Sequence, residues 1–142
     1  MTGAIAMIRV ITFGTFDLFH IGHVRILERA RALGDHLTVG VSTDQLNFSK
    51  KAKYPIYSEQ DRMGIVAALK CVDAVFPEHS LELKESYILE HGADVLVMGH
   101  DWEGRFDDMG RVCKVLYLPR TEGISSTDVK ARVAATQGGA AA

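Results

Sequence analysis

The sequence is poor in the residues that would indicate a disulfide framework, a metal site or a membrane span. Cys71 and Cys113 are its two cysteines, so no disulfide scaffold is expected and a reducing cytoplasm is the expected location. No apolar run approaches the roughly 20 residues of a membrane span, and no secretory signal is evident. A formal net charge of −2 gives no basic footprint for nucleic acid or for an anionic membrane. We therefore expect small-molecule partners, and any basic site must be local.

The length and composition are those of one globular domain. A chain of 142 residues has the size of a common domain, and 47% apolar with 24% charged residues is typical of soluble globular proteins. We expect a single domain over residues 7–136, with flexible ends at 1–6 and 137–142. No internal repeat, low-complexity linker or second domain is evident.

Apolar runs alternate with helical patterns along the chain, which predicts an α/β protein with a parallel sheet of about five strands covered on both faces. The apolar runs predict strands at 7–13, 36–42, 72–76, 94–99 and 113–118. Apolar spacing and capping residues predict helices at 21–33, 58–69, 81–90 and from Ser125 or Ser126 to about Ala134. Polar loops are expected at 47–57 and 100–110. Such sheets bind ligands beyond the carboxyl ends of their strands, where the segments 14–23, 100–110 and 120–127 begin.

A turn with two histidines, residues 14–23, joins the first strand to the first helix. A helix N-terminus attracts anions through its free N–H groups and its dipole. His20 and His23 are three residues apart and therefore share one face of the first turn. Gly22, between them, has no side chain to block a close ligand. Two imidazole donors beside free backbone amides predict a phosphate-binding site.

Three other readings of this turn compete with a phosphate-binding site. The histidines alone are compatible with a structural pair that caps the helix. A zinc site needs further ligands, and Cys71 and Cys113 are not in a recognised metal spacing. A dinucleotide site would have Gly-x-Gly-x-x-Gly here, which the sequence lacks. The strand, the turn and both histidines together favour nucleotidyl transfer.

Residues 14–23 resemble the signature of the cytidylyltransferase family within the HxGH nucleotidyltransferases. Residues 120–127 resemble the second signature of that family, and residues 101–107 resemble the version found in members that act on glycerol 3-phosphate. The similarity covers nearly the whole chain, from about Ile8 to Val133. It implies a single-domain, Rossmann-like, doubly wound fold. It also implies transfer of a cytidylyl group from CTP to a small polyol phosphate, with glycerol 3-phosphate favoured.

Cytidylyl transfer requires that phosphate charge be neutralised and that the attacking oxygen be aligned, and no side chain need act as the nucleophile. His20 and His23 fit as donors to phosphate oxygens, and a nearby triphosphate should raise the pKa of both. Lys51 and Arg120 complete the catalytic set that the resemblance implies. Contacts to the nucleotide are expected from Thr15, Phe16, His20, Gly22, His23, Lys53, Arg120, Thr121, Gly123, Ile124, Ser125, Ser126 and Thr127.

The resemblance implies that Lys51 and Lys84 contact the acceptor, although from the residues alone Lys84 reads as a surface lysine. The loop with the lysines is one residue longer than in a typical member, so Lys50 could replace Lys51. Asp17 is open between contacting the substrate, orienting the first helix and helping to hold Mg²⁺. Mg²⁺ or another divalent cation is the expected cofactor, with no complete metal site predicted from protein side chains.

Three departures from the family pattern leave the acceptor open. Leu81 stands where an aromatic residue is usual, Lys70 replaces a usual arginine, and His100 replaces a usual acid. The alternatives are the same chemistry on another phosphorylated acceptor, or ATP use as in FAD-synthetase-like adenylyltransferases. A silent nucleotide-binding scaffold is the non-enzyme alternative, which the retained histidines, lysines and Arg120 disfavour. Family members are commonly dimers, so a homodimer is expected, and CDP-glycerol is expected to be a precursor of teichoic acid or another cell-surface polymer.

Overall fold

The computed structural model describes residues 6–139, with side chains described to residue 136. Its centre is a parallel sheet in the order β3-β2-β1-β4-β5. The strands are β1 (Arg9–Gly14), β2 (His36–Ser42), β3 (Ala74–Glu78), β4 (Val95–Gly99) and β5 (Lys114–Leu118). This order, with β1 in the middle, is that of a Rossmann-like doubly wound sheet. The predicted α/β class and five parallel strands are confirmed.

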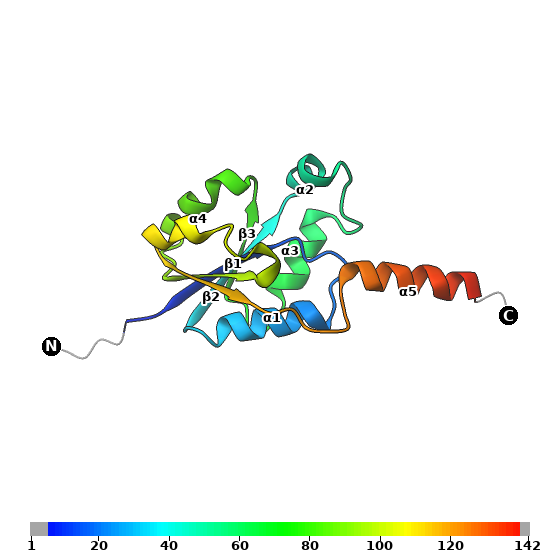
Figure 1. The fold of residues 1–142 in the computed structure, drawn as a ribbon, viewed down its shortest axis with the longest axis horizontal. Helices are drawn as coiled ribbons and strands as arrows, with labels where there is room; N and C mark the ends of the chain where they lie inside the picture. Colours follow the sequence, from blue (N-terminus) through cyan, green and yellow to red (C-terminus); the bar gives the residue numbers. More distant parts are fainter. Residues whose placement is uncertain (1–5, 140–142) are drawn as a thin grey trace.

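Helices cover both faces of the sheet (Figure 1). The helices of the described chain are α1 (Ile21–Arg31), α2 (Asp44–Lys51), α3 (Glu59–Ala67), α4 (Lys84–Glu90) and α5 (Ser126–Gly139), of which α5 extends away from the sheet. One buried cluster joins alternate strand residues to Leu27 of α1 and Val66 of α3. A second cluster joins the opposite strand face to Tyr87 and Ile88 of α4. Each face of the sheet therefore has its own apolar core.

The strand predictions agree with the structure within about two residues. The largest shift is at β3, which was expected at 72–76 and runs to Glu78, past Pro77. Pro77 lacks an N–H to donate to a neighbouring strand, and such a residue is tolerated because β3 is an edge strand.

The prediction of a polar loop over 47–57 is wrong in its first part, where α2 continues to Lys51. The hydroxyl of Thr43 caps this helix by accepting the N–H of Leu46 at 3.1 Å. Leu46 and Asn47 are buried beneath it. Lys50 and Lys51, which follow them, are typical of a solvated loop. They are equally favourable on the last turn of a helix, because positive charge there lies at the negative end of the helix dipole.

Three other segments differ from their predictions. The helix expected at 81–90 begins as a 3-10 turn, η1 (Leu81–Leu83), before α4. The loop 100–110 contains two more such turns, η2 (His100–Trp102) and η3 (Asp107–Arg111). Helix α5 extends past Ala134 to Gly139. Of the ends expected to be flexible, 1–6 and 137–142, residues 1–5 and 140–142 lie outside the described residues, whereas 137–139 continue α5. The predicted domain limits stay a prediction.

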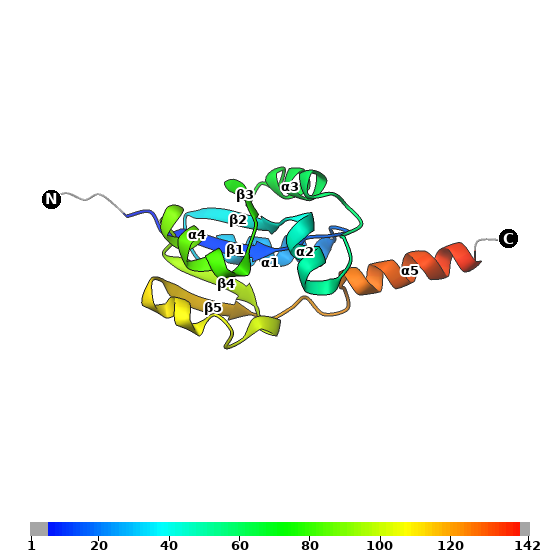
Figure 2. The ribbon, with the colours of Figure 1, turned by 90° about the horizontal axis from the view of Figure 1, so that it is seen from above.

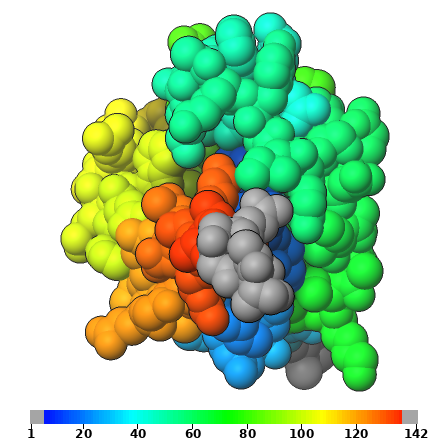
Figure 3. Space-filling view, turned by 90° about the vertical axis from the view of Figure 1, so that its right-hand side faces the viewer, coloured from blue at the N-terminus to red at the C-terminus, as the bar shows by residue number. Residues whose placement is uncertain are grey.

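The strands point their carboxyl ends toward one side of the molecule, from which α5 extends away (Figures 1 and 2). Residues 130–136 of α5 are exposed. Figure 3 looks at this side, with α5 in the middle, the region of α2 above it and the region of η2 and η3 at its left. Within residues 6–139, no helix is both long enough and apolar enough to cross a membrane.

Candidate active site

A cleft of about 530 Å³ lies at the carboxyl edge of the sheet. Segments that follow β1, β4 and β5 line it, together with the end of α2 and the residues after it. All the predicted nucleotide contacts except Gly123 line this cleft, as do Asp17 and Lys51. Gly123 instead has a φ of +80°, which a side chain would disfavour, and so shapes the turn before α5. The two sequence segments, about a hundred residues apart, therefore form one site.

The two histidines cap α1 through their own rings. The backbone N–H of Gly22 donates to Nδ1 of His20 at 3.0 Å, and the N–H of His20 donates to Nδ1 of His23 at 3.1 Å. The rings stack, with centroids 3.9 Å apart. A neutral imidazole whose Nδ1 accepts must hold its proton on Nε2. Both rings are thus held in the tautomer whose Nε2–H can donate to a ligand in the cleft.

Burial keeps both histidines neutral in the free protein. It lowers the pKa of His20. The pKa of His23 falls to about 4, first because of burial and then because of the neighbouring His20, and Asp17 offsets this in part. The rings of Phe16 and Phe19 lie against His23, with centroids at 5.5 and 5.0 Å. The expected rise in these pKa values on triphosphate binding concerns the complex and stays a prediction.

The turn before the histidines is strained and tightly packed. Phe16 and Leu18 have φ values of +57° and +47°, which non-glycine residues rarely adopt. Side chains added at two glycines would collide with this turn. A Cβ at Gly14 would lie 2.8 Å from the Phe16 ring, and a Cβ at Gly22 would lie 2.7 Å from the His20 ring. The strain is located at the site, where strained backbone commonly marks function.

Asp17 ties the turn to the residues before α3. Its two carboxylate oxygens accept the backbone N–H groups of Ile56 and Tyr57, at 2.8 and 2.9 Å. Its carbonyl oxygen accepts the hydroxyl of Ser126 at 2.7 Å. The carboxylate is buried. Of the roles left open for Asp17, the structure favours hydrogen bonding, directed to the segment before α3 rather than to α1.

The residues between Lys51 and Tyr57, here called the lysine segment, form one wall of the cleft. Lys51, Lys53, Tyr54 and Pro55 line it. Ala52 ends α2 with a φ of +57°, which turns the chain between the two lysines. Lys50 is not among the lining residues. Burial lowers the pKa of Lys50, and the carboxylate of Glu78 opposes this shift. Lys50 therefore lies within electrostatic reach of Glu78.

The second anion-binding terminus is the start of α5. The N–H of Asp128 donates to the hydroxyl of Ser125, which caps the helix. Arg120 lines the cleft beside it, with its guanidinium 3.6 Å from the carboxylate of Asp101. Sequence reasoning missed Lys130, which also lines the cleft. Its position four residues after Ser126, hence on the same helix face, was an available signal.

The three departures from the family pattern lie in different surroundings. Nδ1 of His100 accepts the N–H of Arg120 at 3.2 Å, an acceptor role that a carboxylate could also fill. Lys70 is exposed and lines a separate shallow hollow beside α1. Leu81 does not line the main cleft.

Lys84 is not a surface residue, contrary to the reading from the residues alone. It is buried, and its Nζ lies 2.6 Å from the carboxylate of Glu78, also buried. The rings of Phe13 and Phe106 flank the ammonium, with centroids at 3.7 and 4.9 Å. Burial lowers the pKa of Lys84, and Glu78 opposes this. Lys84 does not line the main cleft, although Phe13 beside it does.

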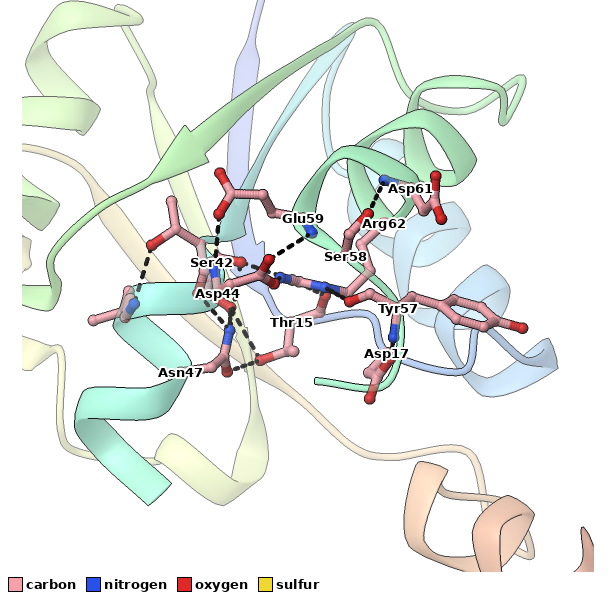
Figure 4. A network of polar contacts seen from close by, with 12 residues as sticks. Thr15, Asp17, Ser42, Asp44, Asn47, Tyr57, Ser58, Glu59, Asp61 and Arg62 are labelled. Atoms are coloured by element: carbon pink, nitrogen blue, oxygen red, sulfur yellow. Dashed lines mark hydrogen bonds and ion pairs between the residues drawn. The ribbon is translucent and has the colours of Figure 1, made fainter. Parts of the chain in front are cut away.

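Sequence reasoning also missed Arg62, whose side chain is fully buried. It lies at the centre of a polar network between the first turn, α2 and the lysine segment (Figure 4). A lone arginine on a helix reads as a solvent-exposed residue. Its sequence signal was weak, because the groups that it binds are mostly backbone carbonyls.

Two helix N-termini that face one cleft of a Rossmann-like sheet, with histidines, lysines and an arginine around them, define a nucleotide-binding protein of the phosphoryl-transfer type. The cytidylyltransferase-like family model matches residues 11–132. The chain belongs to the cytidylyltransferase-like family.

Curated relatives cover most of the chain. A glycerol-3-phosphate cytidylyltransferase of Bacillus subtilis is 50% identical over 128 residues, which are 90% of this chain and 98% of that protein. That of Staphylococcus aureus is 48% identical, over 87% and 93% of the two chains. An FAD synthase of Thermoplasma volcanium is 28% identical, over 89% and 94%. A solved structure, a lipopolysaccharide core biosynthesis protein of Thermoplasma volcanium, has a TM-score of 0.72 at 27% identity and covers 82% of this chain and all of that one.

Proposed function

We propose that this chain is a CTP:glycerol-3-phosphate cytidylyltransferase, which forms CDP-glycerol and pyrophosphate. The observation that carries the proposal is the 50% identity to the Bacillus subtilis enzyme over 98% of that enzyme's length. The cleft supports it, because both motif segments line one space with the residue types that bind a triphosphate.

The proposed reaction is a direct displacement at the α-phosphorus of CTP. A phosphate oxygen of glycerol 3-phosphate forms the new P–O bond, and the bond to the bridging oxygen of pyrophosphate breaks. Pyrophosphate leaves with the electron pair. The Nε2–H groups of His20 and His23 donate to phosphate oxygens on which charge develops, and Lys51, Lys53 and Arg120 neutralise that charge. The neutral histidines donate without first taking up a proton.

Mg²⁺ belongs to the proposal as the ion that accompanies CTP, because Mg²⁺ is commonly bound through substrate phosphates and water. The side chains near the cleft fit a resident ion poorly. Among residues 6–139, no group of three or more histidine, cysteine or acidic residues could hold a metal. Both oxygens of Asp17 already accept backbone N–H groups. We assign no step to the metal.

On the acceptor side, we propose that Lys84 of the buried Lys84–Glu78 pair binds the phosphate of glycerol 3-phosphate. Lys84 contacts Phe13, which lines the cleft, so the proposal requires the ring or the ion pair to move before the ammonium can meet the acceptor phosphate. Lys51, which lines the cleft, is the second proposed contact to that phosphate. The homodimer, the cytoplasmic location and the supply of a cell-surface polymer stay part of the proposal.

The test is pyrophosphate release with Mg²⁺ over a panel of two nucleotides and three acceptors. CTP with glycerol 3-phosphate should give the highest kcat/KM. Ethanolamine phosphate and FMN represent the acceptors suggested by the more distant relatives, an ethanolamine-phosphate cytidylyltransferase and an FAD synthase. A preference for ATP with FMN would replace the proposal by FAD-synthetase chemistry. No release with any pair would favour a silent nucleotide-binding protein.

A further inference from the structure

Arg62 joins three segments around the cleft through four of its five N–H groups (Figure 4). Its Nε donates to the carbonyl of Tyr57 at 3.0 Å. One terminal nitrogen donates to the carbonyls of Thr15 at 2.9 Å and Ser42 at 2.7 Å. The other lies 2.7 Å from the carboxylate of Asp44. Arg62 therefore connects the end of β1, the junction of β2 with α2, and the lysine segment.

Hydrogen bonds hold the lysine segment at its far end, and the ring of Tyr54 stacks on Phe48 of α2 with centroids 4.7 Å apart. At its far end, Arg62 and Asp17 bind the carbonyl of Tyr57 and the N–H groups of Ile56 and Tyr57. Helix α2, which precedes the segment, is held at its start, where the N–H of Asp44 donates to the carboxylate of Glu59 and the N–H of Glu59 donates to the carboxylate of Asp44. Residues 51–54 are exposed, and Lys51 and Lys53 line the cleft.

We infer that Arg62 is a positioning residue that holds the lysine segment against residues 14–23, the turn with the two histidines, here called the histidine turn. This inference rests on the proposed function, in which Lys51 and Lys53 bind phosphate. The carbonyl of Thr15 belongs to the histidine turn, and that of Tyr57 ends the lysine segment. One rigid, planar guanidinium thus sets the distance between the two walls of the cleft. Arg62 does not line the cleft and acts through the lysines.

The geometry of the bonds explains why an arginine is needed. The guanidinium is planar and directs its N–H groups along fixed directions to acceptors on different sides. A lysine has three donors on one nitrogen, so it cannot reach all four acceptors at once. Arg62→Lys keeps the charge that neutralises Asp44 but leaves at least one of the four acceptors without its N–H donor. We expect the lysine segment to loosen while the two apolar cores stay intact.

The experiment is a double-mutant cycle between Arg62→Lys and the double variant Lys51→Ala/Lys53→Ala. In the wild-type background, Arg62→Lys should lower kcat/KM for CTP by about 10-fold, a usual coupling for groups that act together. In the background that lacks Lys51 and Lys53, the same substitution should lower kcat/KM for CTP by less than about 2-fold. Equal losses in both backgrounds would overturn the inference, because a merely structural residue affects both alike.

The matched control is Val66→Ala, one turn further along α3. Val66 is as buried as Arg62 but belongs to the apolar core, so this variant destabilises the helix without touching the network. At equal loss of melting temperature, its kcat/KM should stay close to that of the wild type. Ile56→Pro supplies a second, milder variant, because it removes the N–H that donates to Asp17 from an exposed residue. It should reproduce the non-additive loss even if Arg62→Lys fails to fold.

Hydrogen exchange separates this inference from the proposed function. In the free protein, the amides of Ile56 and Tyr57 should exchange faster in Arg62→Lys than in Val66→Ala. This readout needs no catalysis. If the wild type forms no CDP-glycerol but exchange rises as expected, the proposed function fails while the role of Arg62 in ordering the segment stands. If the wild type is active and exchange is unchanged, the positioning role is wrong.

Discussion

The histidines combine a structural and a chemical task in opposite nitrogens of the same rings. Each Nδ1 accepts a backbone N–H at the start of α1, and each Nε2–H is left for the ligand. An asparagine at position 23 would keep an acceptor for the N–H of His20 but would not reach as far as Nε2. His23→Asn should therefore fold normally and lose about 10²–10³ in kcat. Steady-state kinetics beside circular dichroism measure both, and near-normal turnover would contradict the assignment.

The lowered pKa of His23 predicts how stability depends on pH. Because the pKa of His23 is about 4 in the folded protein and 6.5 is the ordinary value of a histidine, the unfolded chain binds the proton first as the pH falls. The folded state thus loses stability between pH 6.5 and 4, by at most about 1.4 kcal/mol for each pH unit. Thermal melts at pH 7 and pH 5 should show a smaller fall for His23→Asn than for the wild type. Equal falls would mean that His23 is not held neutral.

Lys84 carries a stability role that complicates its use as a probe of the acceptor. Lys84→Met would leave Glu78 charged and buried, at a cost of about 3–5 kcal/mol. Glu78→Gln/Lys84→Met should recover most of this stability, yet both variants should raise the KM for glycerol 3-phosphate far more than that for CTP. Arg111→Met breaks the exposed pair with Glu85 and is the control. An unchanged acceptor KM in the double variant would move the acceptor site elsewhere.

The elements were predictable where an apolar run or a cap marked them. β2 was expected at 36–42 and is observed at His36–Ser42. The start of α3 followed from Ser58, whose hydroxyl accepts the N–H of Asp61. Helix α2 was missed, because much of what holds it in place is tertiary. The hydroxyl of Thr15 donates to the side-chain oxygen of Asn47, and the guanidinium of Arg62 donates to the carboxylate of Asp44, and no local pattern announces such bonds.

The observed position of the His20 ring requires glycine at position 22. In Gly22→Ala, the new Cβ would meet the His20 ring and Ile124, at 2.7 and 3.1 Å. Alanine favours helix by up to about 1 kcal/mol, so the melting temperature should change little. A displaced His20 should nevertheless cost about 10-fold or more in kcat. Gly64→Ala in α3 is the control, because its Cβ meets open space and should leave activity unchanged. Equal activities of the two variants would argue against the packing of His20 on Gly22.

At the scale of the whole molecule, the site could be assembled from sequence because both motifs follow strands of a parallel sheet. The residues behind the cleft could not be predicted from the sequence. The burial of Lys84 and Arg62 depends on how β3, α2 and the lysine segment meet, and a charged residue in a sequence ordinarily indicates a surface. The assignment of Lys51 rather than Lys50 to the cleft likewise needed the turn at Ala52.

Nucleotide preference should appear as a shift in the unfolding of the whole molecule. A ligand that binds the folded state raises stability by about 2.7 kcal/mol at one hundred times its Kd. With Mg²⁺ and equal concentrations, CTP should raise the melting temperature more than ATP does. Arg120→Ala should reduce the shift by CTP, because it removes charge at the second helix terminus. Better protection by ATP would instead favour the FAD-synthetase-like alternative.

The division of the site between the two ends of the chain has a practical consequence. Both histidines and the lysine segment precede Gly92, whereas Arg120 and the start of α5 follow it, and β1 meets β4 in the middle of the sheet. A chain divided at Gly92 would give two fragments that each hold one phosphate-binding helix terminus. Nucleotidyl transfer would then require the fragments to reassociate, so this enzyme is suited to conversion into a split reporter. Because α5 extends away from the sheet, fusion partners attached behind it would lie clear of the cleft.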